Sequence, residues 1–143
     1  MKFSIGSDHR GFEHKEKIKT FFDTIDWVDV GSYSTERSDY PLYAHLVAQN
    51  IIQNKTQNGV LLCGTGIGMA IAANRYKGIY AGLAWNQEVA RRAKEDDNVT
   101  ILVLPADYIT TEQACTMVHA WITAIYRGGR YQERLDLIDM LFK

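Results

Sequence analysis

The sequence predicts an α/β protein built as a single doubly wound, Rossmann-like domain, with three αβα layers and a five-stranded parallel sheet. Short apolar runs alternate with helical patterns along the whole chain, as expected for parallel strands covered by helices on both faces. The length of 143 residues fits one domain, and 46% hydrophobic with 23% charged residues is ordinary globular composition. No linker or repeat divides residues 1–143, so we expect one domain throughout.

Five apolar runs predict the strands, and each is short and mostly bounded by Gly, Asn or Asp. They lie at Lys2–Gly6, Trp27–Gly31, Gly59–Cys63, Ile79–Ala84 and Val99–Leu104. Runs without polar alternation are typical of strands buried on both faces of a parallel sheet. Ligands of such sheets bind beyond the carboxyl ends of the strands, so the residues that follow each run are the candidates for a site.

Helical patterns fall between these runs and after them. Apolar residues recur at helical spacing in two sets: Ile18, Phe21, Phe22 and Ile25, and Ala114, Val118, Trp121, Ile122 and Ile125. Thr110 and Gln113 have the spacing of a capping box. The stretch Asp39-Tyr40-Pro41 predicts a helix start with proline in the first turn.

Charge and reactive side chains exclude several classes of function. The chain has 16 Lys and Arg against 17 Asp and Glu, and this net charge of −1 gives no electrostatic footprint for nucleic acid or an anionic membrane. Cys63 and Cys115 lie far apart without CxxC or HxxxH spacing, so we expect no metal. Two thiols without a disulfide pattern, no signal-peptide apolar region and no membrane-length run together predict a cytoplasmic protein.

The strongest local signal is the stretch from Cys63 to Met69, Cys-Gly-Thr-Gly-Ile-Gly-Met, where a strand ends and a helix of small residues begins. Alternating glycines at a helix N-terminus let backbone N–H groups converge on an anion. The stretch is neither GxGxxG nor a P-loop, because Met69 replaces the last glycine and no Lys-Ser/Thr follows. One alternative is a tight turn with a buried, inert cysteine. We favour a reactive Cys63, since a helix N-terminus lowers the pKa of a thiol.

Asp8 and His9 follow the first strand, and a carboxylate beside an imidazole there suits acid–base catalysis or the binding of a hydroxyl and an anion. The alternative for Asp8 is a cap for the helix that Gly11 opens. Surface or packing roles are expected for the histidines inside helical patterns, His14, His45 and His119.

Two arginines near the C-terminus form a third candidate group. Arg130 and Arg134 are four residues apart, so both guanidinium groups can reach one ligand from a single helical face. Planar forks of this kind suit phosphate oxygens. The alternative is a solvated face or a set of surface salt bridges.

Together these segments resemble the ribose-5-phosphate isomerase B family, which includes the galactose-6-phosphate isomerase subunits. The matching stretches occur in the family's order and span nearly the whole chain. They are residues 6–12 (GSDHRGF), 34–43 (STERSDYPLY), 63–74 (CGTGIGMAIAAN) and 128–130 (GGR). The block that begins at Cys63 is the most specific of the four.

The resemblance implies cofactor-free aldose–ketose isomerisation of a phosphorylated sugar, with the conversion of ribose 5-phosphate to ribulose 5-phosphate favoured. It implies that Cys63 moves a proton between C1 and C2 through an enediolate. Thr65 and the backbone amides of Gly64, Gly66 and Gly68 would stabilise the negative charge that develops on the substrate oxygen.

Other roles also follow from the resemblance alone. It implies that Asp8 and Tyr43 contact the sugar, and that His9, Arg130 and Arg134 bind the phosphate. It further implies a homodimer with sites near the subunit interface.

The sequence departs from the family pattern at two places. Where the ribose-5-phosphate enzymes carry a His-Asn pair, whose His helps to open the furanose ring, this chain has Asp96 and Asp97. A family arginine after the fifth strand is replaced by Asp107. Asp96 could replace the imidazole only if it exchanges a proton near neutral pH.

These departures leave three alternatives open. The first is an isomerase for a hexose 6-phosphate of the galactose or allose type, and the second is one subunit of a hetero-oligomeric isomerase. The third is a sugar-phosphate-binding protein without catalysis. Cys63 and Thr65 argue against the third, because pure binding does not require a thiol.

Overall fold

The computed structural model describes residues 1–142, and a sheet of five parallel strands forms its centre. The strands are β1 (Lys2–Ser7), β2 (Asp26–Asp29), β3 (Asn58–Cys63), β4 (Ala81–Leu83) and β5 (Ile101–Pro105). Their order across the sheet is β2-β1-β3-β5-β4. The five predicted strands are confirmed, with ends that differ by one or two residues.

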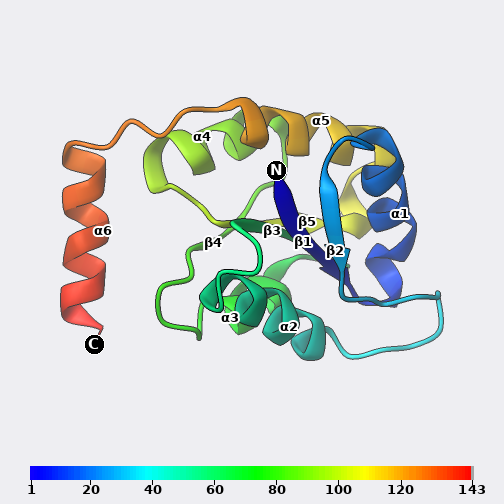
Figure 1. Cartoon of the computed structure of the whole chain (residues 1–143). Coiled ribbons are helices and arrows are strands. Elements are labelled where there is room, and N and C mark those ends of the chain that lie inside the picture. Colours follow the sequence, from blue (N-terminus) through cyan, green and yellow to red (C-terminus); the bar gives the residue numbers. More distant parts are fainter. Residues whose placement is uncertain (143) are drawn as a thin grey trace.

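Helices cover both faces of this sheet. They are α1 (Phe12–Phe21), α2 (Tyr40–Ile52), α3 (Ile67–Ala73), α4 (Gln87–Asp97), α5 (Thr111–Thr123) and α6 (Arg130–Leu141), with short 3-10 turns η1 (His9–Gly11) and η2 (Ala106–Tyr108). Helices α1, α4 and α5 lie on one face, and α2 and α3 lie on the other (Figure 1). The predicted three-layer, doubly wound architecture is therefore confirmed. No helix within residues 1–142 has the length and apolarity to cross a membrane.

The apolar core divides into two clusters because successive side chains of a strand point to opposite faces. In β3, Val60 and Leu62 join the cluster beneath α1, α4 and α5, which also contains Trp121. Leu61 and Cys63 join the cluster beneath α2 and α3. The alternation thus directs Cys63, the last residue of β3, toward the side of the sheet that α3 covers.

Helix ends follow the capping signals better than the apolar spacing. The capping box of Thr110 and Gln113 is present at the start of α5. Asp39 precedes α2 but makes no side-chain capping bond. The apolar spacing predicts helices that extend too far at the C-termini of α1 and α5. Phe22 and Ile25 lie beyond α1, and Ile125 lies beyond α5 and is exposed. Phe22 and Ile25 nevertheless pack against the core from the turn that follows α1.

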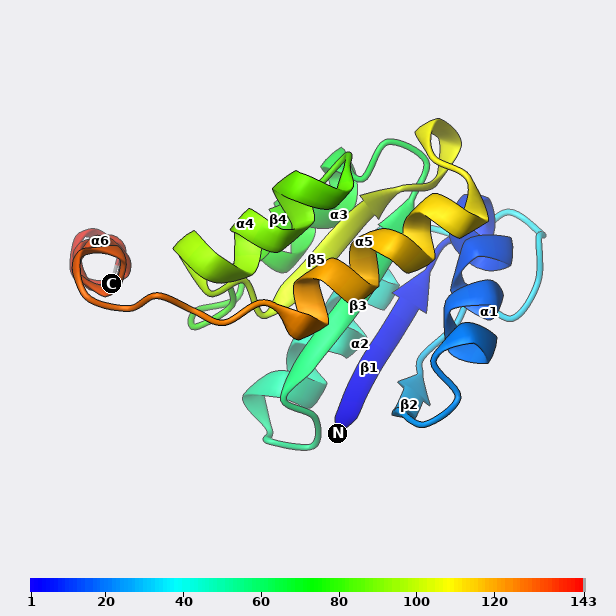
Figure 2. The ribbon, with the colours of Figure 1, turned by 90° about the horizontal axis from the view of Figure 1, so that it is seen from above.

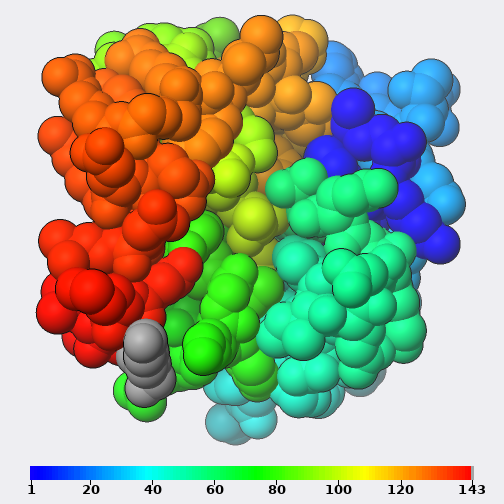
Figure 3. Space-filling model, turned by 60° about the vertical axis from the view of Figure 1, so that its left-hand side comes forward, coloured from blue at the N-terminus to red at the C-terminus, as the bar shows by residue number. Residues whose placement is uncertain are grey.

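Helix α6 stands beside the sheet, whereas the other helices lie on its faces (Figures 1 and 2). The connection from α5 is tied to α4 by a hydrogen bond from the Arg127 amide to the Glu95 carbonyl (3.0 Å). Leu135 packs inward with 3% of its surface exposed, while Leu137, Met140 and Leu141 are exposed. In Figure 3 this helix, in red, forms the surface beside the green segment between α3 and β4.

Candidate active site

An open cleft lies at the carboxyl ends of β1 and β3. These neighbouring strands connect to opposite sides of the sheet, since β1 leads to β2 and β3 leads toward β4 and β5. Such a switch point is where doubly wound sheets bind ligands. The cleft has a volume of about 600 Å³, and its lining includes the predicted residues Asp8, Cys63, Gly64, Thr65 and Gly68. The fold therefore brings together the two strongest groups of candidates from the sequence.

Cys63 ends β3 with only 5% of its surface exposed. Burial raises the pKa of its thiol, and the negative charge of Asp8 adds to the increase. The backbone amides of Met69, Gly66 and Thr65 point at the sulfur and oppose this effect. The expectation of a lowered thiol pKa is therefore wrong, because burial outweighs the amides. The amides still provide the donors that a thiolate or an oxyanion needs.

Two glycines of this loop are required by backbone and packing. Gly66 adopts φ 76°, in the left-handed region that side chains rarely occupy, and it begins α3. At Gly68 a Cβ atom would lie 2.5 Å from the Cζ atom of Tyr40, so this glycine lets the tyrosine ring lie against the loop. Thr65 accepts a hydrogen bond from the Ile67 amide through Oγ1 (3.2 Å), which fixes its hydroxyl at the edge of the cleft.

Asp8 is 5% exposed and caps the turn that follows β1. Its Oδ1 atom accepts hydrogen bonds from the amides of Arg10 (3.0 Å) and Gly11 (3.3 Å). Asp8 therefore caps the 3-10 turn η1, whereas α1 itself begins at Phe12 with Gly11 as an N-cap that makes no side-chain bond. This capping is compatible with a role in the site, because both bonds end on one oxygen. Burial raises the pKa of Asp8 in spite of these bonds.

His9 and Tyr43 are not among the residues that line the cleft. The Nδ1 atom of His9 lies within hydrogen-bonding distance of both the Ser38 amide (3.2 Å) and the Ser38 carbonyl (3.3 Å), and the tautomer of the ring decides which bond forms. Tyr43 packs its ring toward Gly31, and its side chain does not line the cleft. Tyr40, three residues earlier on α2, lines the cleft instead.

Sequence reasoning did not predict a site role for several residues that line the cleft, among them Arg10, Tyr40 and Tyr108, and it noted Asp107 only as a departure from the family pattern. Arg10 directly follows the Asp8-His9 motif, and Asp107 follows the predicted fifth strand. Their positions after the carboxyl ends of strands were the signal that could have identified both as site residues. Their contact could not be foreseen, because it joins residues 97 positions apart.

Arg130 and Arg134 belong to a different part of the chain. With Arg127 they surround the ring of Tyr131, at 5.7 Å for Arg127, 5.3 Å for Arg130 and 5.4 Å for Arg134. The predicted proximity of Arg130 and Arg134 is therefore present. They lie near the C-terminal end of α4, because the charge of Asp96 acts on Arg130 and Arg134 acts on Asp97. Helix α4 runs from the carboxyl end of β4 back to the amino end of β5. Within one chain the two arginines do not join Cys63 in the cleft.

Asp96 lies in the same region as these arginines. Its carboxylate pairs with Arg92 (3.3 Å) and Arg127 (3.8 Å), on the last turn of α4. Burial and the charge of Asp96 raise the pKa of the neighbouring Asp97, while Arg134 opposes that increase. We use the name α4–α6 junction for the region formed by Asp96, Asp97, Arg127, Arg130, Tyr131 and Arg134.

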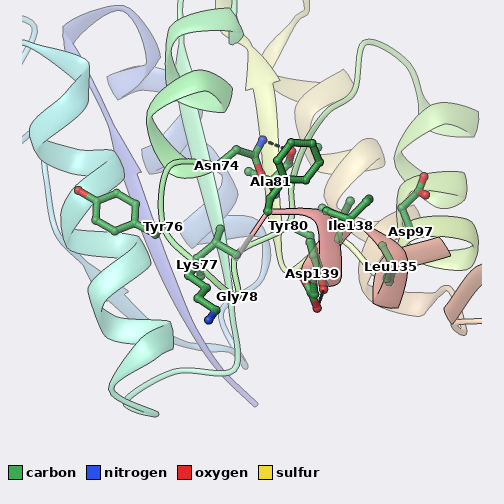
Figure 4. Close-up of a pocket in the computed structure, with 14 residues that line it drawn as sticks. Asn74, Tyr76, Lys77, Gly78, Tyr80, Ala81, Asp97, Leu135, Ile138 and Asp139 are labelled. Atoms are coloured by element: carbon green, nitrogen blue, oxygen red, sulfur yellow. Dashed lines mark hydrogen bonds between the residues drawn. The ribbon is translucent and has the colours of Figure 1, made fainter. Parts of the chain in front are cut away.

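A second cavity of about 470 Å³ separates α6 from the edge of the sheet (Figure 4). Tyr80 donates a hydrogen bond to Asp139 across it (2.6 Å), and Leu135 and Ile138 form its apolar wall. It shares no lining residue with the Cys63 cleft.

The remaining predictions concern thiols and metals. Both cysteines are free and buried. Cys115 belongs to the core cluster around Trp121, so it is a packing residue. Within residues 1–142, no three His, Cys, Asp or Glu side chains are grouped so that they could hold a metal ion.

Comparisons with known proteins agree with the resemblance drawn from the sequence. The pattern of the family described as Ribose/Galactose Isomerase matches residues 3–138. The chain is 35% identical to ribose-5-phosphate isomerase B of Escherichia coli, over 98% of this chain and 95% of that protein. It is 36% identical to ribose-5-P isomerase B of Listeria innocua, over 97% and 95%.

Solved structures agree with this as well. The ribose 5-phosphate isomerase of Thermotoga maritima superposes with a TM-score of 0.94 at 45% identity, over 97% of each chain. Ribose-5-phosphate isomerase B of Mycoplasma genitalium, solved with bound ribulose-5-phosphate, superposes with a TM-score of 0.93 at 35% identity, over 98% of this chain and 95% of that one. With the cleft and its cysteine loop, these matches lead to one conclusion. The chain belongs to the Ribose/Galactose Isomerase family.

Proposed function

We propose that the protein is a cofactor-independent aldose–ketose isomerase that converts ribose 5-phosphate to ribulose 5-phosphate in the cytoplasm. The observation that carries this proposal is the position of Cys63 in the cleft, near three backbone amides and in the same lining as Asp8. An isomerase of this kind needs one group that moves a proton between two adjacent carbons. It also needs donors for the oxygen that becomes negative.

In the proposed reaction the Cys63 thiolate removes the proton from C2 of the open-chain aldose. The electron pair moves toward C1, and the former aldehyde oxygen becomes the charged oxygen of an enediolate. The Cys63 thiol then returns its proton to C1, while the hydroxyl proton of O2 moves to O1. The aldehyde is reduced and the C2 alcohol is oxidised within one molecule, so no external electron carrier is required.

The loop that follows Cys63 supplies the electrostatics of this step. The amides of Thr65 and Gly66 and the Thr65 hydroxyl lie where a charged oxygen beside Cys63 would need donors. The Oδ2 atom of Asp8 is available to a sugar hydroxyl, because the capping bonds end on Oδ1. Burial raises the pKa of Asp8, which suits it to exchange a proton between O1 and O2.

The phosphate-binding roles proposed for Arg130 and Arg134 require a second subunit. Within one chain these arginines lie at the α4–α6 junction, away from the cleft, so they can serve a Cys63 site only across an interface. Apolar side chains are exposed on α6, at Leu137, Met140 and Leu141, and beside the cleft, at Ile67 and Ile71. We propose a homodimer that buries these surfaces and places the junction of one subunit over the cleft of the other.

A substrate panel tests the proposed function. Purified protein is assayed with ribose 5-phosphate, ribulose 5-phosphate, and galactose and allose 6-phosphates, and solvent-proton exchange at C2 is followed by NMR. We expect ribose 5-phosphate to give the highest kcat/KM, and Cys63→Ala to reduce kcat by at least roughly a thousandfold. Cys115→Ala is the matched control, because that cysteine packs in the core.

Each alternative has its own result in this panel. A hexose 6-phosphate that exceeds ribose 5-phosphate would replace the substrate and keep the mechanism. Binding without proton exchange would favour the non-catalytic alternative. Activity that appears only after a different chain is added would favour a hetero-oligomer.

A further inference from the structure

Among residues 1–142, a single cationic side chain lines the cleft, and it belongs to a residue with no role in the reaction described above. Arg10 follows His9 on η1, and its side chain lies beside Cys63, Gly64 and Thr65. Among the described residues that line the cleft, the other charged groups are the carboxyls of Asp8 and Asp107. Without Arg10 the cleft of one subunit would present only negative charge to a phosphorylated substrate.

Asp107 holds Arg10 in place. Arg10 donates a hydrogen bond from Nε to Oδ2 of Asp107 (2.8 Å), and its Nη2 atom contacts the same oxygen. Asp107 is anchored in turn, since its amide donates to the carbonyl of Gly64 (3.0 Å). The side chains are 57% exposed for Arg10 and 31% exposed for Asp107, so the pair faces the open part of the cleft.

The Arg10–Asp107 pair packs against the loop that follows Cys63. A Cβ atom at Gly64 would lie 2.8 Å from Nε of Arg10 and 2.7 Å from Oδ2 of Asp107. Only glycine at position 64 therefore lets the guanidinium lie directly over the loop. Guanidinium groups have five N–H donors, and Asp107 engages donors on Nε and Nη2, which leaves the two donors on Nη1 for another partner.

We propose that Arg10, positioned by Asp107, is a phosphate-binding residue of this isomerase and sets its affinity for phosphorylated substrates. The proposal rests on the proposed function for the identity of the substrate, and it adds a residue on the catalytic subunit itself. A planar guanidinium with donors remaining suits phosphate oxygens. It would compensate for the arginine that the family resemblance places at position 107, where this chain has Asp107.

The test compares Arg10→Ala with wild type in two measurements. One is the KM and kcat for ribose 5-phosphate, and the other is the affinity for inorganic phosphate, measured by ³¹P NMR titration without turnover. We expect KM and the phosphate Kd each to rise about tenfold to a hundredfold, as for loss of a charged hydrogen bond, with kcat changed less than about threefold. Arg10→Lys keeps the charge but loses the planar guanidinium, so we expect its KM and phosphate Kd to lie between those of wild type and Arg10→Ala.

Relocating the arginine provides the sharper variant. In Arg10→Ala/Asp107→Arg the cation enters the cleft from η2 instead of η1, and we expect phosphate affinity to return to within about threefold of wild type. Lys17→Ala removes one positive charge from the exposed side of α1 and is the matched control. Thermal unfolding of each variant confirms that it is folded.

The proposal is overturned if folded Arg10→Ala binds inorganic phosphate within twofold of wild type. It is also overturned if the relocated arginine restores nothing. Because phosphate binding is measured without turnover, an inactive wild type would reject the proposed isomerase and leave this inference to be decided by the phosphate affinities.

Discussion

The cleft and the α4–α6 junction contain the two sets of candidate residues, and they are held in different ways. In the cleft, Cys63 ends β3 and Asp8 directly follows β1, and both are 5% exposed. Backbone amides fix the Asp8 carboxylate, and others point at the Cys63 sulfur. At the junction, ion pairs and aromatic contacts between partly exposed side chains hold Arg127 and Asp96.

This difference indicates which part of the chemistry each region can perform alone. Proton transfer needs groups held within a fraction of an ångström, and a buried strand end provides this within one chain. Exposed ion pairs contribute about 0–1 kcal/mol and do not fix geometry to that degree. We therefore expect the junction to become ordered for binding only when a second subunit covers it.

The largest effect is expected from mixed dimers. Cys63→Ala removes the proposed base, and Arg130→Ala/Arg134→Ala removes the two proposed phosphate-binding arginines, so each homodimer should lose at least about 99% of wild-type kcat/KM. A heterodimer of the two variants has one site with both defects and one site with none. With different tags for purification, we expect it to recover about half of the wild-type activity per dimer.

The same measurement can reject the shared site. If each subunit uses its own arginines, both sites of the heterodimer carry one defect and activity stays near the level of the parent variants. Sedimentation of the wild type as a monomer at assay concentration would contradict the dimer itself.

An intermediate effect is expected at Asp8, inside the cleft. The negative charge of Asp8 contributes to the raised pKa of Cys63, and the thiolate is the active form of the proposed base. In wild type, kcat/KM should therefore rise with pH above neutrality as Cys63 ionises. Asp8→Asn removes the charge and keeps the shape, so the rising limb should move to lower pH while the plateau falls roughly tenfold through the lost proton exchange.

Thr65→Ser serves as the control for this profile, because it keeps the hydroxyl beside Cys63 and adds no charge. A rising limb that stays at the wild-type pH in Asp8→Asn would show that Asp8 does not influence the thiol. A limb that moves equally in both variants would attribute the shift to a general change in the cleft.

The contrast between the regions also explains what the sequence could predict. The strands, the Cys63 loop and the Asp8 motif were foreseeable, because short apolar runs and glycine spacing are local signals that burial then enforces. The rise in the pKa of Cys63 was not, since it depends on how fully α3 and the neighbouring strands exclude water. The Arg10–Asp107 pair was hidden because a contact between η1 and η2 exists only after β1, β3 and β5 are aligned.

The smallest effect is expected at Asp96, where the family resemblance places a ring-opening histidine. Its carboxylate pairs with Arg92 and Arg127, and these contacts make it an anchor for the connection that leads to Arg130. Asp96→Asn keeps the size and weakens both pairs. Because the side chains involved are partly exposed, we expect a loss of about 0.5 kcal/mol in unfolding free energy. The change in kcat with ribose 5-phosphate should be less than about threefold, as for an anchor that transfers no proton.

Asp96→His separates the two roles of this position. An imidazole exchanges protons near neutral pH, so if ring opening limits turnover, the histidine should raise kcat for the furanose substrate and leave the rate with an open-chain analogue unchanged. A fall of tenfold or more in kcat for Asp96→Asn, limited to furanose substrates, would instead identify Asp96 as the proton donor. In that case the junction would act in catalysis as well as in binding. Proton transfer would then not be confined to the cleft.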